Sequence, residues 1–186
     1  MSIALKAQSV SIAFGGVAAL EDVSINFPER EIIGIIGPNG AGKTTLLNVI
    51  CGMTPPDQGD IFLHDVSLNN MKPSDVASLG LRRTFQSSQL FPGMSVLENM
   101  MCGLHLMGTT KLFGAIFRSQ TMKDEEAEMR HRAIEALDFV GFKHFADRPG
   151  SALSFGQQRI IEIARTLIYE PKVVLLDELA VGLSVT

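Results

Sequence analysis

Residues 37–44 read GPNGAGKT, a stretch that matches the pattern G-x-x-x-x-G-K-[ST] and decides the fold. An apolar run at residues 32–36 precedes it, and we expect this run to form a strand covered on both faces in a parallel sheet. Residues 43–51 follow as a predicted helix that Gly52 stops. This order of strand, loop and helix predicts a phosphate-binding loop; the alternative is a glycine-rich turn with an exposed lysine.

Each residue type in this loop has a role in holding a nucleotide. Glycines let successive backbone N–H groups converge on phosphate oxygens, and the start of the helix adds a partial positive charge. We expect Lys43 to reach the β and γ phosphates of ATP and the hydroxyl of Thr44 to ligate Mg²⁺. The predicted nucleotide-binding residues of this segment are Gly37, Pro38, Asn39, Gly40, Ala41, Gly42, Lys43, Thr44 and Thr45.

A pair of acids marks a second part of the predicted site. Residues 173–176 are an apolar run typical of a buried strand, and Asp177 and Glu178 follow it. Ligands of open α/β sheets bind at the C-terminal ends of the strands. We therefore predict Asp177 as a Mg²⁺ ligand and Glu178 as the catalytic group that orients or deprotonates the attacking water. The alternative is a pair of surface acids.

Composition excludes several classes of protein. The chain has 186 residues, of which 46% are hydrophobic and 19% charged, which is typical of one folded globular domain. A net charge of -4 leaves no broad positive field, so nucleic acid is not expected as a partner. Cys51 and Cys102 form no C-x-x-C pair, so neither a disulfide framework nor a zinc site is indicated. No apolar run reaches the ~18 residues of a membrane span, so a membrane role is expected to be peripheral.

Two capping-box pairs predict helix starts in the second half of the chain. Ser95 and Glu98 precede a helix expected over residues 96–107, and Ser154 and Gln157 precede a helix with one apolar stripe. This stripe is expected to consist of Ile160, Ile163, Ala164, Leu167 and Ile168. Further strands are predicted over residues 5–12, 23–27, 59–63 and 81–86, with a short helix from Pro73 to Gly80 and a charged helix over residues 123–140.

Residues 153–158, LSFGQQ, resemble the signature motif of ABC transporter ATP-binding subunits, and they precede Asp177 and Glu178 as in that family. The resemblance implies that Ser154, Gly156 and Gln157 contact the phosphates of a nucleotide held by the opposite subunit. A serine N-cap and a glycine at a helix start suit this contact, because both present hydrogen-bond donors to an anion. An ordinary capped helix is the alternative.

The same resemblance assigns two further residues. Gln86 is similar to the family's glutamine that senses Mg²⁺ and the γ phosphate, so we expect a catalytic and metal-binding role for it. Phe14 occupies the place of the aromatic residue that stacks on adenine, with a simple core phenylalanine as the alternative. The family's switch histidine would lie downstream of residue 186.

The resemblance implies an α/β P-loop ATPase with an N-terminal antiparallel β region, a mainly parallel core sheet and a helical subdomain. We predict one ATP-binding domain over residues 1–186 that lacks its C-terminal part. Its core is expected over residues 1–89 and 154–186, and its helical subdomain over about residues 90–153.

In its amino-acid sequence, the chain most resembles the ATP-binding subunits of branched-chain amino acid importers. The implied function is binding of ATP and Mg²⁺ and hydrolysis that drives uptake of a small solute. The implied partners are integral membrane permease subunits, a second ATP-binding subunit in a nucleotide-sandwich dimer and, indirectly, a periplasmic solute-binding protein. The implied location is the cytoplasmic face of the bacterial inner membrane. A urea importer subunit, a soluble ABC ATPase and a non-hydrolysing nucleotide-binding fragment are the alternatives.

Overall fold

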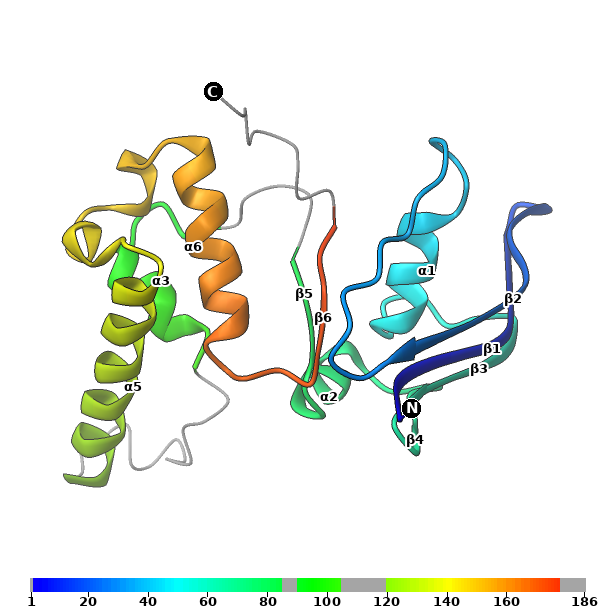
Figure 1. Cartoon of the computed structure of the whole chain (residues 1–186), viewed down its shortest axis with the longest axis horizontal. Helices are drawn as coiled ribbons and strands as arrows, with labels where there is room; N and C mark the ends of the chain where they lie inside the picture. The colour runs from blue at the N-terminus through cyan, green and yellow to red at the C-terminus, as the bar shows by residue number, and fades with distance from the viewer. Residues whose placement is uncertain (1, 85–89, 105–119, 178–186) are drawn as a thin grey trace. The chain divides into compact units, whose positions relative to one another are not determined.

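The computed structural model describes residues 2–84, 90–104 and 120–177, which form two compact units (Figure 1). Unit 1 consists of Met1–Arg83 and Lys172–Leu175, and unit 2 of Thr84–Pro171 and Leu176–Thr186. Each unit has its own hydrophobic cluster. In the described part of the chain, none of the helices combines the length and the apolarity that a membrane span requires.

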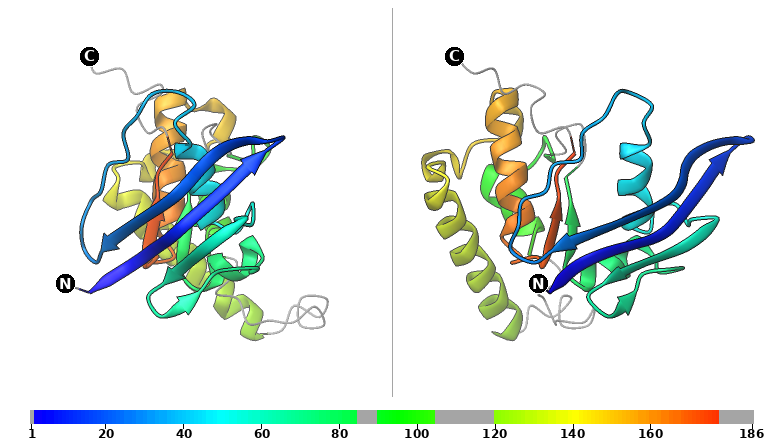
Figure 2. Two further views of the ribbon diagram at one scale, coloured as in Figure 1. Left: turned by 90° about the vertical axis from the view of Figure 1, so that its right-hand side faces the viewer. Right: turned by 45° about the vertical axis from the view of Figure 1, so that its right-hand side comes forward.

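An antiparallel sheet forms one side of unit 1. Its strands are β1 (Ile3–Phe14), β2 (Val17–Pro28), β3 (Gln58–Leu63) and β4 (Val66–Ser67), in the order β2-β1-β3-β4. Both views of Figure 2 show the long β1–β2 hairpin with β3 beside it. Gly15 and Gly16 make the hairpin turn with φ values of 56° and 85°, which glycine adopts without strain. The predicted antiparallel region is confirmed, with longer strands than the sequence indicated.

Helix α1 (Lys43–Ile50) supplies the other side of the unit 1 core. Its buried residues Leu46, Val49 and Ile50 belong to the same cluster as Leu5 and Val10 of β1. The helix ends where predicted, because Gly52 has a left-handed φ of 69° that breaks the helical backbone. Gly52 is also closely packed, since a Cβ there would lie 2.8 Å from the carbonyl oxygen of Met71. The short helix α2 (Pro73–Ser78) begins with its proline, which lacks the N–H that a helix start leaves unpaired.

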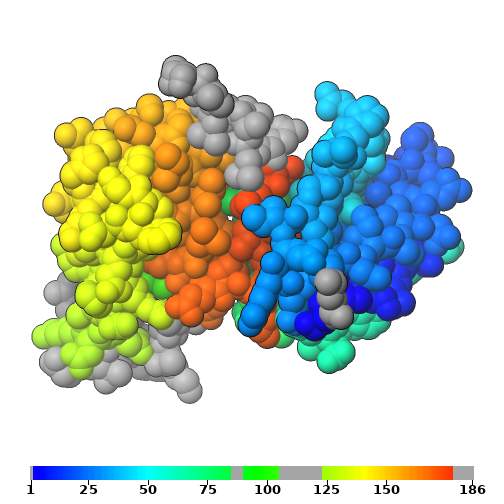
Figure 3. Space-filling view, in the orientation of Figure 1, coloured from blue at the N-terminus to red at the C-terminus, as the bar shows by residue number. Residues whose placement is uncertain are grey.

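The predicted parallel strand at residues 32–36 is wrong. Residues 31–38 have no regular structure, and Ile32 and Ile36 are 105% and 95% exposed. The light-blue segment that contains them is visible at the surface of unit 1 in Figure 3. A strand requires a neighbouring strand that takes its backbone hydrogen bonds, and apolar composition alone does not supply one. Among the described residues, the parallel pairing joins β5 (Leu81–Arg83) to β6 (Val173–Leu175).

Unit 2 consists mainly of helices. Its helices are α3 (Val96–Cys102), α5 (Gln120–Phe139) and α6 (Phe155–Leu167), and the 3-10 turns η2 (Lys143–Phe145) and η3 (Gly150–Ala152) join α5 to α6 (Figure 1). Their common core contains Val96, Leu97, Met100, Ala133, Leu137, Leu153, Ile161 and Ala164. Helix α3 stops at Cys102, and the N–H groups of Gly103 and Leu104 then donate to the carbonyl oxygens three residues earlier; the predicted end at residue 107 lies outside the described residues. Gly103 packs against α6, because a Cβ there would lie 2.6 Å from the carbonyl oxygen of Arg165.

The buried face of α6 differs from the predicted apolar stripe. Leu167 is 49% exposed, and Ile160 and Ile163 are half-buried. Ala164 is buried as predicted, and Ile168 packs against the cluster of unit 2. The other buried residues are Arg159, Ile161 and Glu162, which lie outside the predicted stripe. Arg159 and Glu162 form an ion pair of 2.7 Å and are buried together.

Candidate nucleotide-binding site

The loop of residues 37–42 leads directly into α1, so its backbone and the helix start form one continuous site in unit 1. Gly42 is the N-cap of α1, with φ 80° and ψ 4°. Gly40 has a φ of 83° in the same left-handed region. Side chains disfavour this region, so the glycines of the motif are required by the backbone path that turns the loop into the helix.

Gly42 is also required for packing. A Cβ at this position would collide with the backbone oxygen of Ala19 and would lie 2.9 Å from Cδ2 of Leu20. Both neighbours belong to β2, so the missing side chain lets the helix start approach the sheet. The close approach places α1 and its loop on the antiparallel sheet.

Lys43 closes the loop. Its Nζ donates to the carbonyl oxygens of Gly37 and Pro38, at 2.8 Å each. Within the loop, the backbone N–H of Ala41 donates to Pro38 at 3.2 Å. The loop is thus folded around an ammonium group, which places a positive charge beside the backbone of the predicted phosphate site.

The start of α1 favours an anion. The first turn of α1 contains no acidic residue, and no side chain caps it. The first N–H groups of a helix have no partner within the helix, and the helix dipole adds a partial positive charge there. The side chain of Thr44 is exposed at this end and that of Thr45 is half-buried. This arrangement is suited to a phosphate group.

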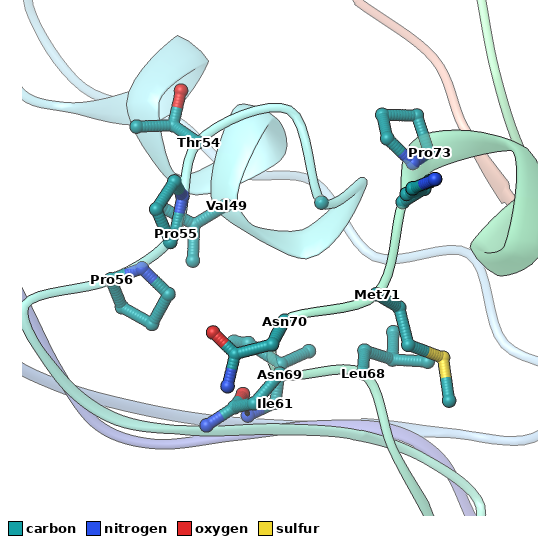
Figure 4. Close-up of a pocket in the computed structure, with 12 residues that line it drawn as sticks. Val49, Thr54, Pro55, Pro56, Ile61, Leu68, Asn69, Asn70, Met71 and Pro73 are labelled. Carbon is teal, nitrogen blue, oxygen red and sulfur yellow. Dashed lines mark hydrogen bonds between the residues drawn. The ribbon is translucent and has the colours of Figure 1, made fainter.

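A second concavity in unit 1 lies at the opposite end of α1. It has a volume of about 280 Å³, and Figure 4 shows the loop after α1 facing the segment after β4 across it. Its lining includes Val49, Pro55, Pro56, Ile61, Leu68, Asn69, Asn70 and Met71. Because the C-terminal end of a helix carries a partial negative charge, this concavity is not suited to phosphate.

Phe14 lies at the end of β1, next to the hairpin turn, and pairs with Val17. Its side chain is 52% exposed, so the alternative of a core phenylalanine is wrong. An exposed aromatic ring can stack on a planar base. Stacking of Phe14 on adenine stays a prediction.

Asp177 follows β6, and its backbone is held from both sides within unit 2. Its N–H donates to Oγ1 of Thr84 at 3.3 Å, and its carbonyl oxygen accepts from Nη2 of Arg159 at 2.6 Å. The side chain of Asp177 is half-buried. The two residues predicted for catalysis, Gln86 and Glu178, lie outside the described residues.

The capping box predicted at Ser154 is confirmed. The backbone N–H of Gln157 donates to Oγ of Ser154 at 3.4 Å, and the backbone N–H of Ser154 donates to Oε1 of Gln157 at 2.9 Å. Helix α6 therefore begins within the LSFGQQ motif, with Gly156 half-buried in its first turn. The contacts of Ser154, Gly156 and Gln157 with a phosphate stay predictions.

Sequence reasoning missed three residues around Asp177: Thr84, Arg159 and Glu162. Thr84, Arg159 and Glu162 are 1%, 1% and 2% exposed. A signal was present, because opposite charges three residues apart on a helix face one another. Further along α6, burial lowers the pKa of the Arg165 guanidinium, and the carboxylate of Glu162 opposes this shift.

Residues 20–181 match the family model for ABC transporters, which covers the loop, α6 and Asp177. The chain belongs to this family. It is the ATP-binding subunit of an ABC transporter, a family that hydrolyses ATP. The predicted fold class and the predicted family are both confirmed.

One similar relative of this ABC protein is the high-affinity branched-chain amino acid transport ATP-binding protein LivG of Salmonella typhimurium. It is 37% identical over 180 residues, which are 97% of this chain and 71% of the relative. The ADP conformation of the ATP-binding cassette MJ1267 superposes with a TM-score of 0.82 at 34% identity, over 99% of this chain and 71% of that one. The ATP-binding cassette MJ0796, a dimer bound to ADP and Pi, superposes with a TM-score of 0.78 at 28% identity, over 97% and 76%.

Proposed function

We propose that this subunit couples ATP hydrolysis to the uptake of a small solute, and that the solute is a branched-chain amino acid. The observation that carries ATP binding is the loop closed by Lys43 at the uncapped start of α1. The identity to LivG, 37% over 97% of the chain, supports the choice of solute. Solute selectivity itself would reside in the membrane and binding-protein partners of the transporter.

In the proposed nucleotide site, different residues bind the phosphates, the adenine, the Mg²⁺ and the attacking water. The N–H groups of residues 37–45 and the ammonium of Lys43 would bind the phosphates, and Phe14 would stack on adenine. Thr44, Gln86 and Asp177 would hold Mg²⁺, since hydroxyl, amide and carboxylate oxygens suit this ion. Bound Mg²⁺ would neutralise the charge that develops on the phosphates. The carboxylate of Glu178 would orient or deprotonate the attacking water.

The proposed assembly is a nucleotide-sandwich dimer on two integral membrane permease subunits, at the cytoplasmic face of the bacterial inner membrane. In it, Ser154, Gly156 and Gln157 would contact the nucleotide of the second ATP-binding subunit. The start of α6 supports this role, because its backbone N–H groups favour an anion. A periplasmic binding protein would deliver the solute to the permeases. We also propose the predicted division into a core, residues 1–89 and 154–186, and a helical subdomain, residues 90–153.

The test is to reconstitute the protein in liposomes with its permease subunits and with the cognate binding protein. Phosphate release is then measured with leucine, with urea and without solute. Stimulation by leucine alone supports the proposal, and it should vanish in Lys43→Ala. Stimulation by urea alone would assign a different solute, and phosphate release that responds to neither would contradict the importer function.

A further inference from the structure

The guanidinium of Arg159 binds two groups at once. Its Nη1 donates to Oε2 of Glu162 at 2.7 Å, and its Nη2 donates to the carbonyl oxygen of Asp177 at 2.6 Å. The planar fork of arginine suits such a double contact, because its donors point in fixed directions. Arg159 therefore joins the first turns of α6 to the backbone that carries the predicted Mg²⁺ ligand.

The carbonyl oxygen of Asp177 belongs to the peptide that links this residue to the next one, and the N–H on its other side is held by Thr84. With both peptide groups held, the backbone dihedrals of Asp177 are restrained, and its carboxylate moves only through its own side-chain torsions. Thr84 and Arg159 are each 1% exposed, so water does not compete for these hydrogen bonds.

The carboxylate of Glu162 compensates the buried positive charge of Arg159. A lone guanidinium in a buried position is unfavourable, and the carboxylate of Glu162, 2% exposed, compensates its charge. A buried ion pair contributes little net stability compared with apolar residues of similar size. Its presence beside the predicted Mg²⁺ ligand therefore points to a role in positioning.

We propose that Arg159 and Glu162 form a positioning pair, which fixes the backbone of Asp177 so that its carboxylate meets the nucleotide-bound Mg²⁺. This inference rests on the proposed function, because it assumes that Asp177 is the metal ligand. It adds that α6, which begins at the signature motif, is tied to the metal ligand through one guanidinium. Displacement of the α6 start would then be transmitted to Asp177.

The experiment measures the affinity of a fluorescent ATP analogue, first in EDTA and then at increasing Mg²⁺. The variant is the double substitution Arg159→Met with Glu162→Leu, which removes both charges of the pair together. We expect unchanged affinity in EDTA, because the loop of residues 37–45 is untouched. The Mg²⁺ concentration for half-maximal enhancement should rise about 10–100-fold, the usual effect of losing a group that orients a metal ligand.

Thr84→Val is the second variant, because it removes the other anchor of Asp177 with little change of volume. It should shift the Mg²⁺ dependence in the same direction. If the double variant does not fold, Thr84→Val alone tests whether anchoring the backbone of Asp177 affects Mg²⁺ binding. The matched control is Arg132→Met, which removes a guanidinium of α5 that pairs with the exposed carboxylate of Glu170 at 3.4 Å. This control should keep the wild-type Mg²⁺ dependence.

The outcomes separate the inference from the proposed function. Wild-type protein whose affinity for the analogue does not respond to Mg²⁺ would overturn the assignment of Asp177 and this inference with it. A normal wild-type response that is retained in a folded double variant and in Thr84→Val would overturn the inference alone. A Mg²⁺ shift in Arg132→Met equal to that of the double variant would also overturn it, since the loss of any guanidinium in unit 2 would then suffice.

Discussion

Gly42 packs directly against the backbone carbonyl of Ala19 in β2, with no room for a side chain between them. The contact joins the start of α1 to the antiparallel sheet. The residue at this position must meet two conditions. Gly42 must adopt a φ of 80°, and it must lack a Cβ. The position of the phosphate-binding loop on unit 1 therefore depends on this glycine.

Substitution Gly42→Ala should lower the free energy of unfolding and weaken ATP binding. A left-handed conformation costs a non-glycine residue about 1–3 kcal/mol, and the clash with Ala19 adds to this. Gly40→Ala is the matched control for stability, because Gly40 has a φ of 83° but open space around it. Thermal melting should show a larger loss for Gly42→Ala; equal losses would mean that the packing contact contributes nothing.

Substitution Lys43→Ala should weaken binding of Mg-ATP about tenfold to more than a hundredfold, since a charge-assisted hydrogen bond contributes about 1.5–3 kcal/mol. It also removes the two bonds that close the loop on Gly37 and Pro38. Titration with a fluorescent ATP analogue measures the effect. Lys123→Ala, on the exposed surface of α5, is the control and should bind as wild type. Wild-type affinity in a folded Lys43→Ala protein would refute the phosphate site.

Substitution Glu178→Gln should slow hydrolysis by about 10²–10⁴-fold without loss of nucleotide affinity, because the amide keeps the shape of the carboxylate and loses its basicity. ATP should then accumulate in a closed dimer, which size-exclusion chromatography with ATP detects. Glu170→Gln is the control, since Glu170 is an exposed acid outside the proposed site. Phosphate release at the wild-type rate in Glu178→Gln would remove Glu178 from the catalytic role.

The stability of unit 2 should depend on pH through Glu98. Backbone and side-chain hydrogen bonds from Ser95 hold the pKa of this carboxyl below its ordinary value of 4.5. A lowered pKa in the folded state means that ionised Glu98 stabilises the fold above pH 4.5, and that this contribution is lost as the pH falls through the folded pKa. Thermal melting of wild type and Glu98→Gln should therefore differ at pH 7 and converge in acid. A difference that does not change with pH would contradict this linkage.

Short-range structure followed directly from the sequence. The capping boxes Ser95–Glu98 and Ser154–Gln157 formed as predicted, because each needs only groups within one helical turn. The helix stop at Gly52 and the glycine requirement of the GPNGAGKT loop are equally local. The local geometry of these motifs could thus be predicted from the sequence, whereas the nucleotide-binding roles of their residues stay predictions, and Gln86 and Glu178 lie outside the described residues.

Long-range contacts were decided only by the tertiary structure. The run at residues 32–36 is as apolar as a buried strand, yet strand pairing joins Leu81–Arg83 to Val173–Leu175, about ninety residues apart in sequence. Likewise, the apolar stripe predicted for α6 included Ile160 and Leu167, of which Leu167 is 49% exposed. The fold buries Arg159 instead, because Glu162 and the carbonyl oxygen of Asp177 compensate its charge. Local patterns report hydrogen bonds within a turn, whereas burial of a strand or a charge depends on partners that only the folded chain brings together.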